Sequence, residues 1–231
     1  MKMNFRYNNF MNILETIKQR KSVRAFLKKN VELEKIRTIL DTAKHAPSGV
    51  NMQPWQVAVV SGDTKKTIEI QMIEALKNNE PERMGYNYYP LKWEEPYKTR
   101  RKETGLLMYS TLNIKREDKE KQFNQWLQNY TAFDAPVVLY FFIDSHLEIG
   151  SYLDYGMFLQ SIMLTAVELG LSTCTQAALA QYPDIVKKEL NIENSKILLC
   201  GIALGYEDKE AIINSYRTPR IALDDFVTFH Q

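Results

Sequence analysis

Side chains able to bind an anion alternate along Arg20-Lys21-Ser22-Val23-Arg24. In an extended chain a spacing of two places the side chains of Arg20, Ser22 and Arg24 on one face. Guanidinium groups match the geometry of phosphate oxygens, so two arginines with a hydroxyl between them form a candidate phosphate site. A solvated basic turn is the competing interpretation, and the residues alone favour it.

A second candidate is the polar loop Ala46-Pro47-Ser48-Gly49-Val50-Asn51-Met52-Gln53-Pro54-Trp55. Its prolines fix φ and lack a backbone donor, while Ser48, Gly49 and Asn51 favour turns. The spacing of apolar residues predicts a helix over 32–45, and the β-rich run 56–61 predicts a strand. The loop therefore follows the carboxyl end of a helix, a place suited to ligands. An ordinary connection between helix and strand is the alternative.

The sequence lacks the common short motifs of nucleotide-binding, metal-binding and nucleophilic sites. It has no G-x-G-x-x-G after a strand, no phosphate-binding P-loop, no H-E-x-x-H and no G-x-S-x-G. His45, His146 and His230 are far apart in sequence, and Cys174 and Cys200 form no C-x-x-C. We therefore predict no metal site and no catalytic side chain, so that a cofactor would have to supply the chemistry of an enzyme.

Bulk composition predicts a globular protein of one domain. The chain has 231 residues, of which 45% are hydrophobic and 25% are charged, with a net charge of +2. This balance gives no electrostatic case for binding nucleic acid or a membrane surface. The apolar run 135–143 is too short to span a bilayer. Two cysteines in apolar surroundings fit a reducing compartment, so we expect a cytoplasmic location.

The remaining elements follow from apolar spacing and from Gly and Pro positions. We predict further helices over 10–19, 64–78, 151–169 and 183–190, and strands over 135–143, 171–176 and 196–204. The helix over 151–169 is apolar on most sides, which predicts that it is buried all round at the centre of a dimer.

Residues 79–134 differ in composition from the rest and are interpreted as a lid inserted beside the core. Aromatic and charged residues are concentrated there, including Tyr86, Tyr88, Tyr89, Trp93 and Tyr97. These rings either line a pocket for a flat ligand or pack the insertion onto the body, and the sequence does not separate the two. A stretch of this length buries too little apolar surface to form an independent domain.

Four motifs together resemble the FMN-dependent nitroreductase family. They are the R-x-S-x-R element at residues 20–24, the loop at 46–55, Gly201-Ile202-Ala203-Leu204-Gly205-Tyr206 and Arg217-Thr218-Pro219-Arg220. The resemblance extends from about residue 13 to about residue 229. It implies one α+β domain over 1–231, with a mostly antiparallel central sheet flanked by helices, in an intertwined homodimer. The insertion, with Tyr88-Tyr89-Pro90 and Phe133-Asp134-Ala135-Pro136, resembles the branch linked to nitrobenzoate-type substrates.

The resemblance also implies a set of FMN-binding residues. Arg20, Ser22, Arg217 and Arg220 would hold the phosphate and ribityl chain, with a further contact from Lys21. Arg24 would approach the N1/O2 edge of the flavin ring. Pro47, Ser48, Gly49 and Asn51 of the second subunit would close over the cofactor, and Gln176 and Ala177 would place a backbone N–H at flavin N5. Relatives commonly have an acidic residue and a glycine in that last place. Asn78 and Asn79 are candidates for the family's asparagine contact to the pyrimidine ring.

The implied activity is a ping-pong reaction. Hydride passes from NADH or NADPH to the flavin, and a small aromatic electron acceptor, typically a nitroaromatic, then enters the same pocket. Quinone or enone reduction on the same flavin fold is an alternative, as is a flavin-binding store or sensor without turnover. A cofactor-free interaction module is a further one. The absorbance spectrum and identity of the bound cofactor separate these possibilities.

Overall fold

A four-stranded antiparallel sheet is the centre of the computed structural model, which describes residues 12–231. Its strands are β1 (Gln56–Ser61), β2 (Val137–Asp144), β3 (Ser172–Gln176) and β4 (Lys196–Gly205), in the order β1-β2-β4-β3. Each neighbouring pair is antiparallel. The predicted α+β class with a mostly antiparallel sheet is confirmed, and the four predicted strands match these bounds to within two residues.

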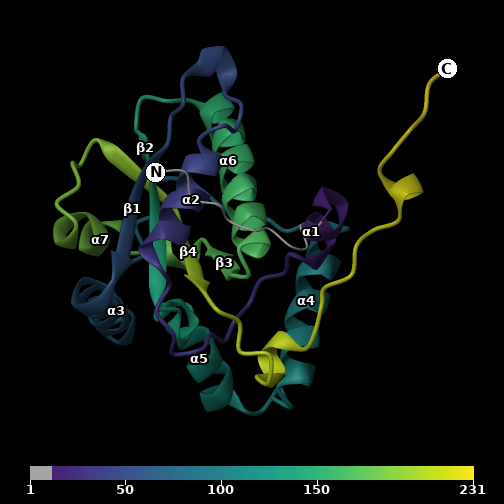
Figure 1. Ribbon diagram of the computed structural model, residues 1–231. Coiled ribbons are helices and arrows are strands. Elements are labelled where there is room, and N and C mark those ends of the chain that lie inside the picture. Colours follow the sequence, from purple (N-terminus) through teal and green to yellow (C-terminus); the bar gives the residue numbers. More distant parts are fainter. Residues whose placement is uncertain (1–11) are drawn as a thin grey trace.

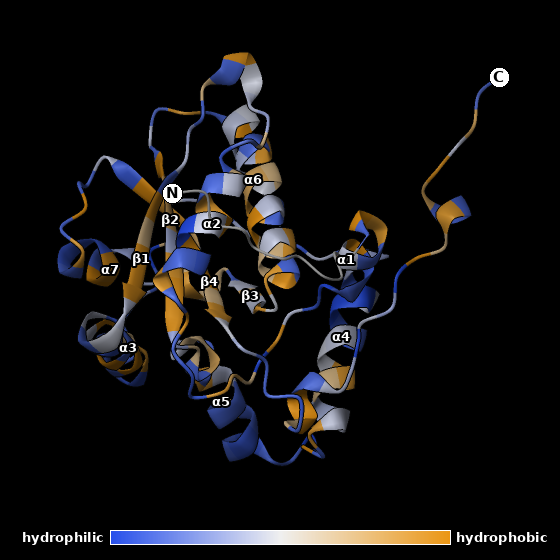
Figure 2. Cartoon of the chain, in the orientation of Figure 1, coloured by the Kyte–Doolittle hydropathy of each residue, from blue (hydrophilic) through white to orange (hydrophobic). Residues whose placement is uncertain are grey.

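Strand β2 is buried on both faces of the sheet, which explains its continuous apolar sequence. Because successive side chains point to opposite faces, Val138 and Tyr140 join one core while Leu139 and Phe141 join the other. The first core includes residues of α3 (Gly62–Lys77) and α7 (Pro183–Glu189), and the second those of α2 (Leu33–Ala43) and α6 (Ile149–Glu168). The hydropathy colouring in Figure 2 shows apolar central strands between helices of mixed character.

Two glycines of β4 allow neighbouring segments to approach the strand closely. A Cβ atom at Gly201 would lie 2.5 Å from Leu179 Cδ1, and one at Gly205 would lie 2.7 Å from Pro136 Cδ. The partner strand has a bulge between Phe141 and Phe142, beside the residue paired with Gly201. These contacts leave no room for a larger side chain.

Helix α6 has an exposed apolar stripe, so the expectation that it is buried all round does not hold within a single chain. Ile149, Leu153 and Met157 are 78%, 70% and 40% exposed. Their spacing of four residues places them on one face. Tyr155, Phe158 and Ile162 on the other side are buried against the sheet. One face of the helix therefore belongs to the core and another remains without a partner in this chain.

The remaining helices are α1 (Ile13–Gln19), α4 (Tyr97–Thr111) and α5 (Lys119–Leu127), with short 3-10 turns at Gly49–Asn51, Ala132–Asp134, Ala178–Ala180, Ile212–Asn214 and Leu223–Asp225. Residues 79–134, the segment interpreted above as an insertion, contain α4 and α5. Figure 1 shows the C-terminal tail running away from the sheet to a distant end. The predicted start of the first helix at Phe10 lies outside the described residues. No helix within residues 12–231 combines the length and the apolar character that crossing a membrane needs.

Candidate functional site

Two adjoining pockets share one residue, Arg24. The smaller has a volume of about 430 Å³ and the larger about 570 Å³. The smaller is lined by Ile17, Lys18, Arg20, Lys21, Ser22, Arg24, Tyr216, Arg217, Thr218 and Arg220. The larger is lined by Arg24, Glu82, Met84, Tyr86, Asn87, Tyr88, Tyr89, Trp126, Asn129, Phe133, Cys174, Thr175, Gln176, Ala177, Ala178 and Gln181. The predicted anion site and the predicted aromatic pocket are therefore neighbours.

The smaller pocket is built on an extended segment beside the sheet edge. Ser22 forms an isolated parallel bridge with Thr173 of β3, and the Val23 N–H donates to the Thr173 carbonyl oxygen at 3.0 Å. The extended backbone turns Val23 into the core, where it is 1% exposed. Ser22 and Arg24, on either side of it in sequence, line the pocket. The alternation read from the sequence is thus imposed by pairing with β3.

Three arginines meet in the smaller pocket without an acidic partner. Burial, followed by the nearby guanidiniums of Arg220 and Arg217, lowers the pKa of Arg20 below its ordinary value. Among the described residues, no ion pair includes any of the three. Clustered like charges are costly unless an anion offsets them, and arginine forks suit phosphate oxygens. The pocket therefore fits a phosphate group such as that of FMN.

The arginines of the tail are held by carbonyl groups. Arg217 donates from Nη1 to the carbonyl oxygen of Lys18 at 2.5 Å and from Nη2 to that of Gln19, at the end of α1. A helix carboxyl end carries partial negative charge and favours a cation. Arg220 donates to the carbonyl and hydroxyl oxygens of Thr218, each at 2.9 Å. The bonds of Arg217 bring the tail motif beside the residue 20–24 segment, nearly two hundred positions earlier in sequence, while those of Arg220 are local to the tail.

The side chain of Lys21 contacts other residues of the protein and stabilises the backbone near the pocket. Its ammonium donates to the Asn214 carbonyl oxygen at 2.6 Å and pairs with Glu207 at 2.7 Å. Asn214 is 3% exposed, accepts the Arg24 N–H at 2.8 Å and donates to the Ala25 carbonyl oxygen at 2.9 Å. Lys21 and Asn214 together fix the backbone that presents Arg24. No local pattern marks Asn214, because its partners are distant in the chain.

Arg24 lies where the two pockets meet. Its Nη1 donates to the Tyr216 hydroxyl at 3.0 Å, and its guanidinium carbon is 6.0 Å from the ring centres of both Phe133 and Tyr216. A cation near an aromatic face is attracted by the ring quadrupole. Arg24 is thereby held between the basic pocket and the aromatic one. A residue that is to approach the ring of a cofactor whose phosphate lies in the basic pocket would need this position.

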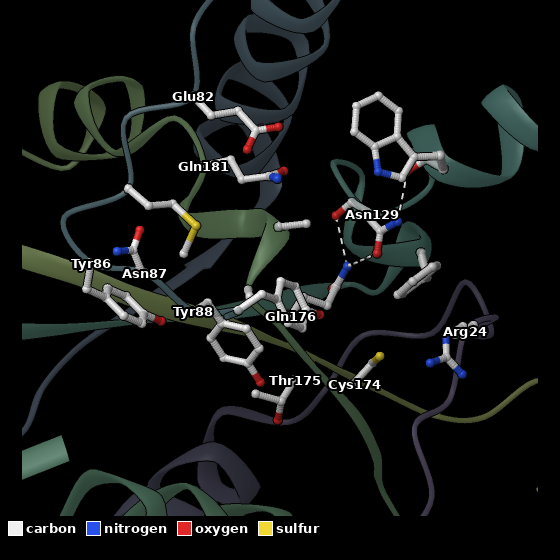
Figure 3. A pocket seen from close by; sticks show the side chains of 16 residues that line it. Arg24, Glu82, Tyr86, Asn87, Tyr88, Asn129, Cys174, Thr175, Gln176 and Gln181 are labelled. Carbon is white, nitrogen blue, oxygen red and sulfur yellow. Dashed lines mark hydrogen bonds between the residues drawn. The ribbon is translucent and has the colours of Figure 1, made fainter. Parts of the chain in front are cut away.

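Gln176 joins the end of β3 to the insertion. It is 5% exposed, and its Nε2 donates to the Asn129 carbonyl oxygen at 2.9 Å and to Asn129 Oδ1 at 3.3 Å, as Figure 3 shows. Asn129 Nδ2 donates in turn to the Trp126 carbonyl oxygen at 2.9 Å. Asn129 thus lines the larger pocket, whereas Asn78 and Asn79 follow α3 and line neither pocket. Sequence reasoning missed Asn129 because it treated the surrounding segment only as a lid.

Some aromatic residues of the insertion line the larger pocket and others do not. Tyr86, Tyr88 and Tyr89 do, whereas Trp93 and Tyr97 do not. Tyr86 also donates its hydroxyl to the Leu199 carbonyl oxygen of β4 at 2.5 Å. Both interpretations of these rings therefore hold, since Tyr86 packs the insertion onto the body and borders the cavity.

The turn before β2 has an unusual backbone. Ala132, Phe133 and Asp134 all have positive φ, at 50°, 56° and 58°. Three consecutive residues other than glycine in this region cost about 1–2 kcal/mol each. Phe133 is 4% exposed and borders the larger pocket beside Arg24. Such strain persists only where surrounding contacts enforce it, and here it positions a pocket residue.

The 46–55 loop is separate from both pockets. The Gly49 N–H donates to both carboxylate oxygens of Asp154 on α6, each at 3.2 Å, and the Gln53 N–H donates to Ser48 Oγ at 3.0 Å. Val50 has a φ of 45° and is 94% exposed. Within one chain, the predicted site residues thus divide between the pockets and this loop. The pocket group is Arg20, Lys21, Ser22, Arg24, Gln176, Ala177, Arg217 and Arg220, and the loop group is Pro47, Ser48, Gly49 and Asn51.

Comparison with known proteins agrees with this geometry. The sequence pattern of the Nitroreductase family matches residues 17–206. The chain is 36% identical to the 4-nitrobenzoate reductase of Pseudomonas putida, over 92% of this chain and 93% of that protein. It is 35% identical to the nitrobenzene nitroreductase of Ectopseudomonas oleovorans, over 93% and 95%. The crystal structure of the FMN and NADPH-dependent nitroreductase NfnB from Sphigopyxis sp. strain HMH superposes with a TM-score of 0.93 at 34% identity, covering 96% of this chain and 100% of that one. The chain belongs to the nitroreductase family.

Proposed function

We propose that this protein is an FMN-dependent oxidoreductase that uses NADPH or NADH to reduce small nitroaromatic compounds. The observation that carries the proposal is the pair of pockets sharing Arg24, one basic and one aromatic. A phosphate fits the first and a flat ring the second. The relatives described above are named for nitrobenzoate and nitrobenzene reduction, and NfnB for FMN and NADPH.

Different residues of this chain would bind different parts of FMN. Arg20, Arg217 and Arg220, with Ser22, would hold the phosphate in the smaller pocket, where their mutual repulsion is relieved by a bound anion. Lys21 supports this pocket through its contacts with Glu207 and Asn214. We assign the family's asparagine role to Asn129, because it lines the larger pocket and Asn78 and Asn79 do not.

When bound, FMN supplies hydride transfer, accepting from the nicotinamide and passing reducing equivalents to the acceptor. Arg24 places a fixed positive charge at the wall of the larger pocket, held by Tyr216. Gln176 and Ala177 set the end of β3 against that pocket, and the Gln176 amide is immobilised by Asn129. Tyr86, Tyr88 and Trp126 provide flat aromatic walls that would favour planar acceptors.

The active protein is proposed to be a homodimer. The stripe of Ile149, Leu153 and Met157 on α6 supports this, since a contiguous exposed apolar face on a soluble protein marks an interface. The exposed loop around Val50 and the apolar tail residues Phe226 and Phe229 lie outside the core of one chain. The loop residues Pro47, Ser48, Gly49 and Asn51 would then complete the pocket of the partner. Residues 79–134 would act as a lid within a single domain.

The test is the spectrum of the purified protein and its response to NADPH. A yellow protein whose flavin absorbance bleaches with NADPH and recovers on adding nitrobenzene is the expected result. Mass spectrometry of the released cofactor should give FMN; FAD as the main species overturns the phosphate-site assignment. Flavin that no reduced nicotinamide bleaches indicates a store or sensor. A much higher kcat/KM for a quinone or an enone than for nitroaromatics favours the alternative reductase.

A further inference from the structure

The larger pocket carries opposite charges at its two ends. Arg24 and Glu82 both line it, and Figure 3 shows them on opposite sides with Gln176 and Asn129 between them. Arg24 belongs to the end that adjoins the basic pocket. Glu82 belongs to the insertion, so the acidic end is the one away from the proposed phosphate site.

The Glu82 carboxylate is not neutralised by a neighbouring cation. No ion pair among residues 12–231 includes it, and the adjacent Arg83 instead points to Asp184, at 3.8 Å, outside this pocket. Its charge is felt by nearby groups: burial raises the pKa of Tyr130, and the charges of Tyr182 and Glu82 add to the effect. An unpaired carboxylate on a cavity wall repels a second anion in the same cavity.

Glu82 is exposed to solvent at the pocket wall, and neutral polar residues line the pocket with it and hold its segment in place. The Arg83 N–H donates to the Gln181 carbonyl oxygen at 2.9 Å, which ties the segment to the turn after β3. Gln181 Oε1 accepts from the Tyr130 hydroxyl at 2.6 Å, so the amide NH₂ of Gln181 is left for the pocket. Asn87 lies on the same side in Figure 3. This end therefore offers a negative charge with hydrogen-bonding groups and no positive charge.

The inference rests on the proposed function. With the flavin ring beside Arg24 and Gln176, the acceptor occupies the rest of the larger pocket, and its substituent remote from the ring faces Glu82. We propose that Glu82 is a specificity-determining residue that disfavours nitroaromatic acceptors bearing a carboxylate and favours neutral or cationic ones. The protein would then differ in substrate class from the 4-nitrobenzoate reductase of Pseudomonas putida despite 36% identity.

The test uses the FMN-bound protein and two acceptors of nearly the same shape, 4-nitrobenzamide and 4-nitrobenzoate. The wild type should have the higher kcat/KM for the amide. Glu82→Gln should reduce the amide-to-benzoate ratio about tenfold, the order expected when one close like-charge repulsion is removed. Glu82→Lys should lower it further, and Glu82→Asp should keep it. Benzamide and benzoate, titrated by their effect on flavin absorbance, should show the same order in dissociation constant without turnover.

Glu80→Gln is the matched control, because it makes the same charge change two residues away on a wall of a different pocket. It should leave the amide-to-benzoate ratio unchanged. If Glu82→Gln and Glu82→Lys leave the ratio and the dissociation constants at the wild-type values, Glu82 does not select the acceptor and the inference is wrong. Equal effects of Glu80→Gln and Glu82→Gln also overturn the inference, since they show that the overall charge of the segment, and not the position of Glu82, sets the amide-to-benzoate ratio. A colourless protein, or one inert to NADPH, refutes the proposed function instead.

Discussion

Arg24 Nη1 donates to the Tyr216 hydroxyl at 3.0 Å, and this bond joins segments that are 192 positions apart in sequence. It holds the guanidinium at the junction of the basic and aromatic pockets. Tyr216 also directly precedes Arg217, which binds the end of α1. The tail and the segment after α1 thus position each other, and the charge of Arg24 has a defined place relative to both pockets.

Arg24 should tune the flavin more than it anchors it. A cation beside the ring stabilises charge that appears only on reduction. We expect Arg24→Ala to lower the reduction potential and slow reduction by NADPH, with a smaller loss of FMN affinity than Arg220→Ala. Arg24→Lys should keep part of the effect, since the charge matters here more than the fork geometry. Spectroelectrochemical titration measures the flavin reduction potential of the wild type and of both Arg24 variants. Outright loss of FMN from Arg24→Ala, or an unchanged potential, would show that Arg24 has another role.

The arginine cluster should bind FMN chiefly through its phosphate. Replacing Arg217 or Arg220 by alanine is expected to weaken FMN binding by about 1–3 kcal/mol each, as for charge-assisted hydrogen bonds. Titration of the apoprotein with FMN and with riboflavin, which lacks the phosphate, measures this. The variants should lose affinity for FMN much more than for riboflavin. Equal losses for the two ligands would place the arginines away from the phosphate.

The exposed stripe of α6 should be required for dimer formation. Leu153→Glu introduces a charge at a position that is 70% exposed in one chain, so it should leave the subunit folded and disrupt the dimer. Ile70→Glu is the control, at an exposed apolar position on α3. Sedimentation at low concentration should show a dimer for the wild type and the control and a monomer for Leu153→Glu. A wild-type protein that is a folded, FMN-bound monomer would refute the shared site.

The close approach at Gly205 should make it intolerant of a methyl group. In Gly205→Ala the new Cβ would lie 2.7 Å from Pro136 Cδ and 2.9 Å from Phe26 Cδ1. Proline and phenylalanine rings move little, so overpacking should lower the free energy of unfolding by about 1–3 kcal/mol. Gly105→Ala in α4 meets no atom within 4 Å and should instead stabilise by about 0.5–1 kcal/mol. Urea unfolding of both variants measures whether the free energy of unfolding falls in Gly205→Ala and rises in Gly105→Ala.

The Asp144–Lys196 ion pair should make a small, pH-dependent contribution to stability. The hydrogen bond from Lys196, at 2.6 Å, lowers the pKa of the Asp144 carboxyl. A lowered pKa in the folded state stabilises above the pKa of the unfolded state, and the effect is lost as the pH falls through the folded value. Because the Asp144 side chain is 40% exposed, Asp144→Asn should cost less than about 1 kcal/mol at neutral pH.

The check on this pair is urea unfolding of the wild type and Asp144→Asn at about pH 7 and about pH 3, on either side of the ordinary aspartate range. The difference in free energy of unfolding should be fully present at the higher pH and smaller at the lower. The same difference at both values would mean that the side-chain packing of Asp144, rather than its charge, supports the fold.

Much of the fold followed from local patterns in the sequence. The continuous apolar run of β2 and the longer apolar stretch of α6 predict these elements, because a strand buried on both faces is apolar throughout and a helix needs a longer run. The alternation of Arg20, Ser22 and Arg24 predicted a candidate anion site, but these residues alone favoured a solvated basic turn; the fold adds Arg217 and Arg220 to the same pocket. The four motifs were sufficient to recognise the family, which the matched residues 17–206 confirm.

Tertiary structure decided how distant residues combine. The bond of Gln176 to Asn129 and that of Arg24 to Tyr216 join positions with no local pattern linking them, so no spacing could predict them. Helix α6 was predicted to be buried on all sides, because hydrophobicity alone does not distinguish a core face from an interface face. Only the packing of the chain shows which side of the helix stays exposed. Likewise, Glu82 is one acidic residue among many in sequence. It becomes a candidate selector of substrates only because the folded insertion places it across a cavity from Arg24.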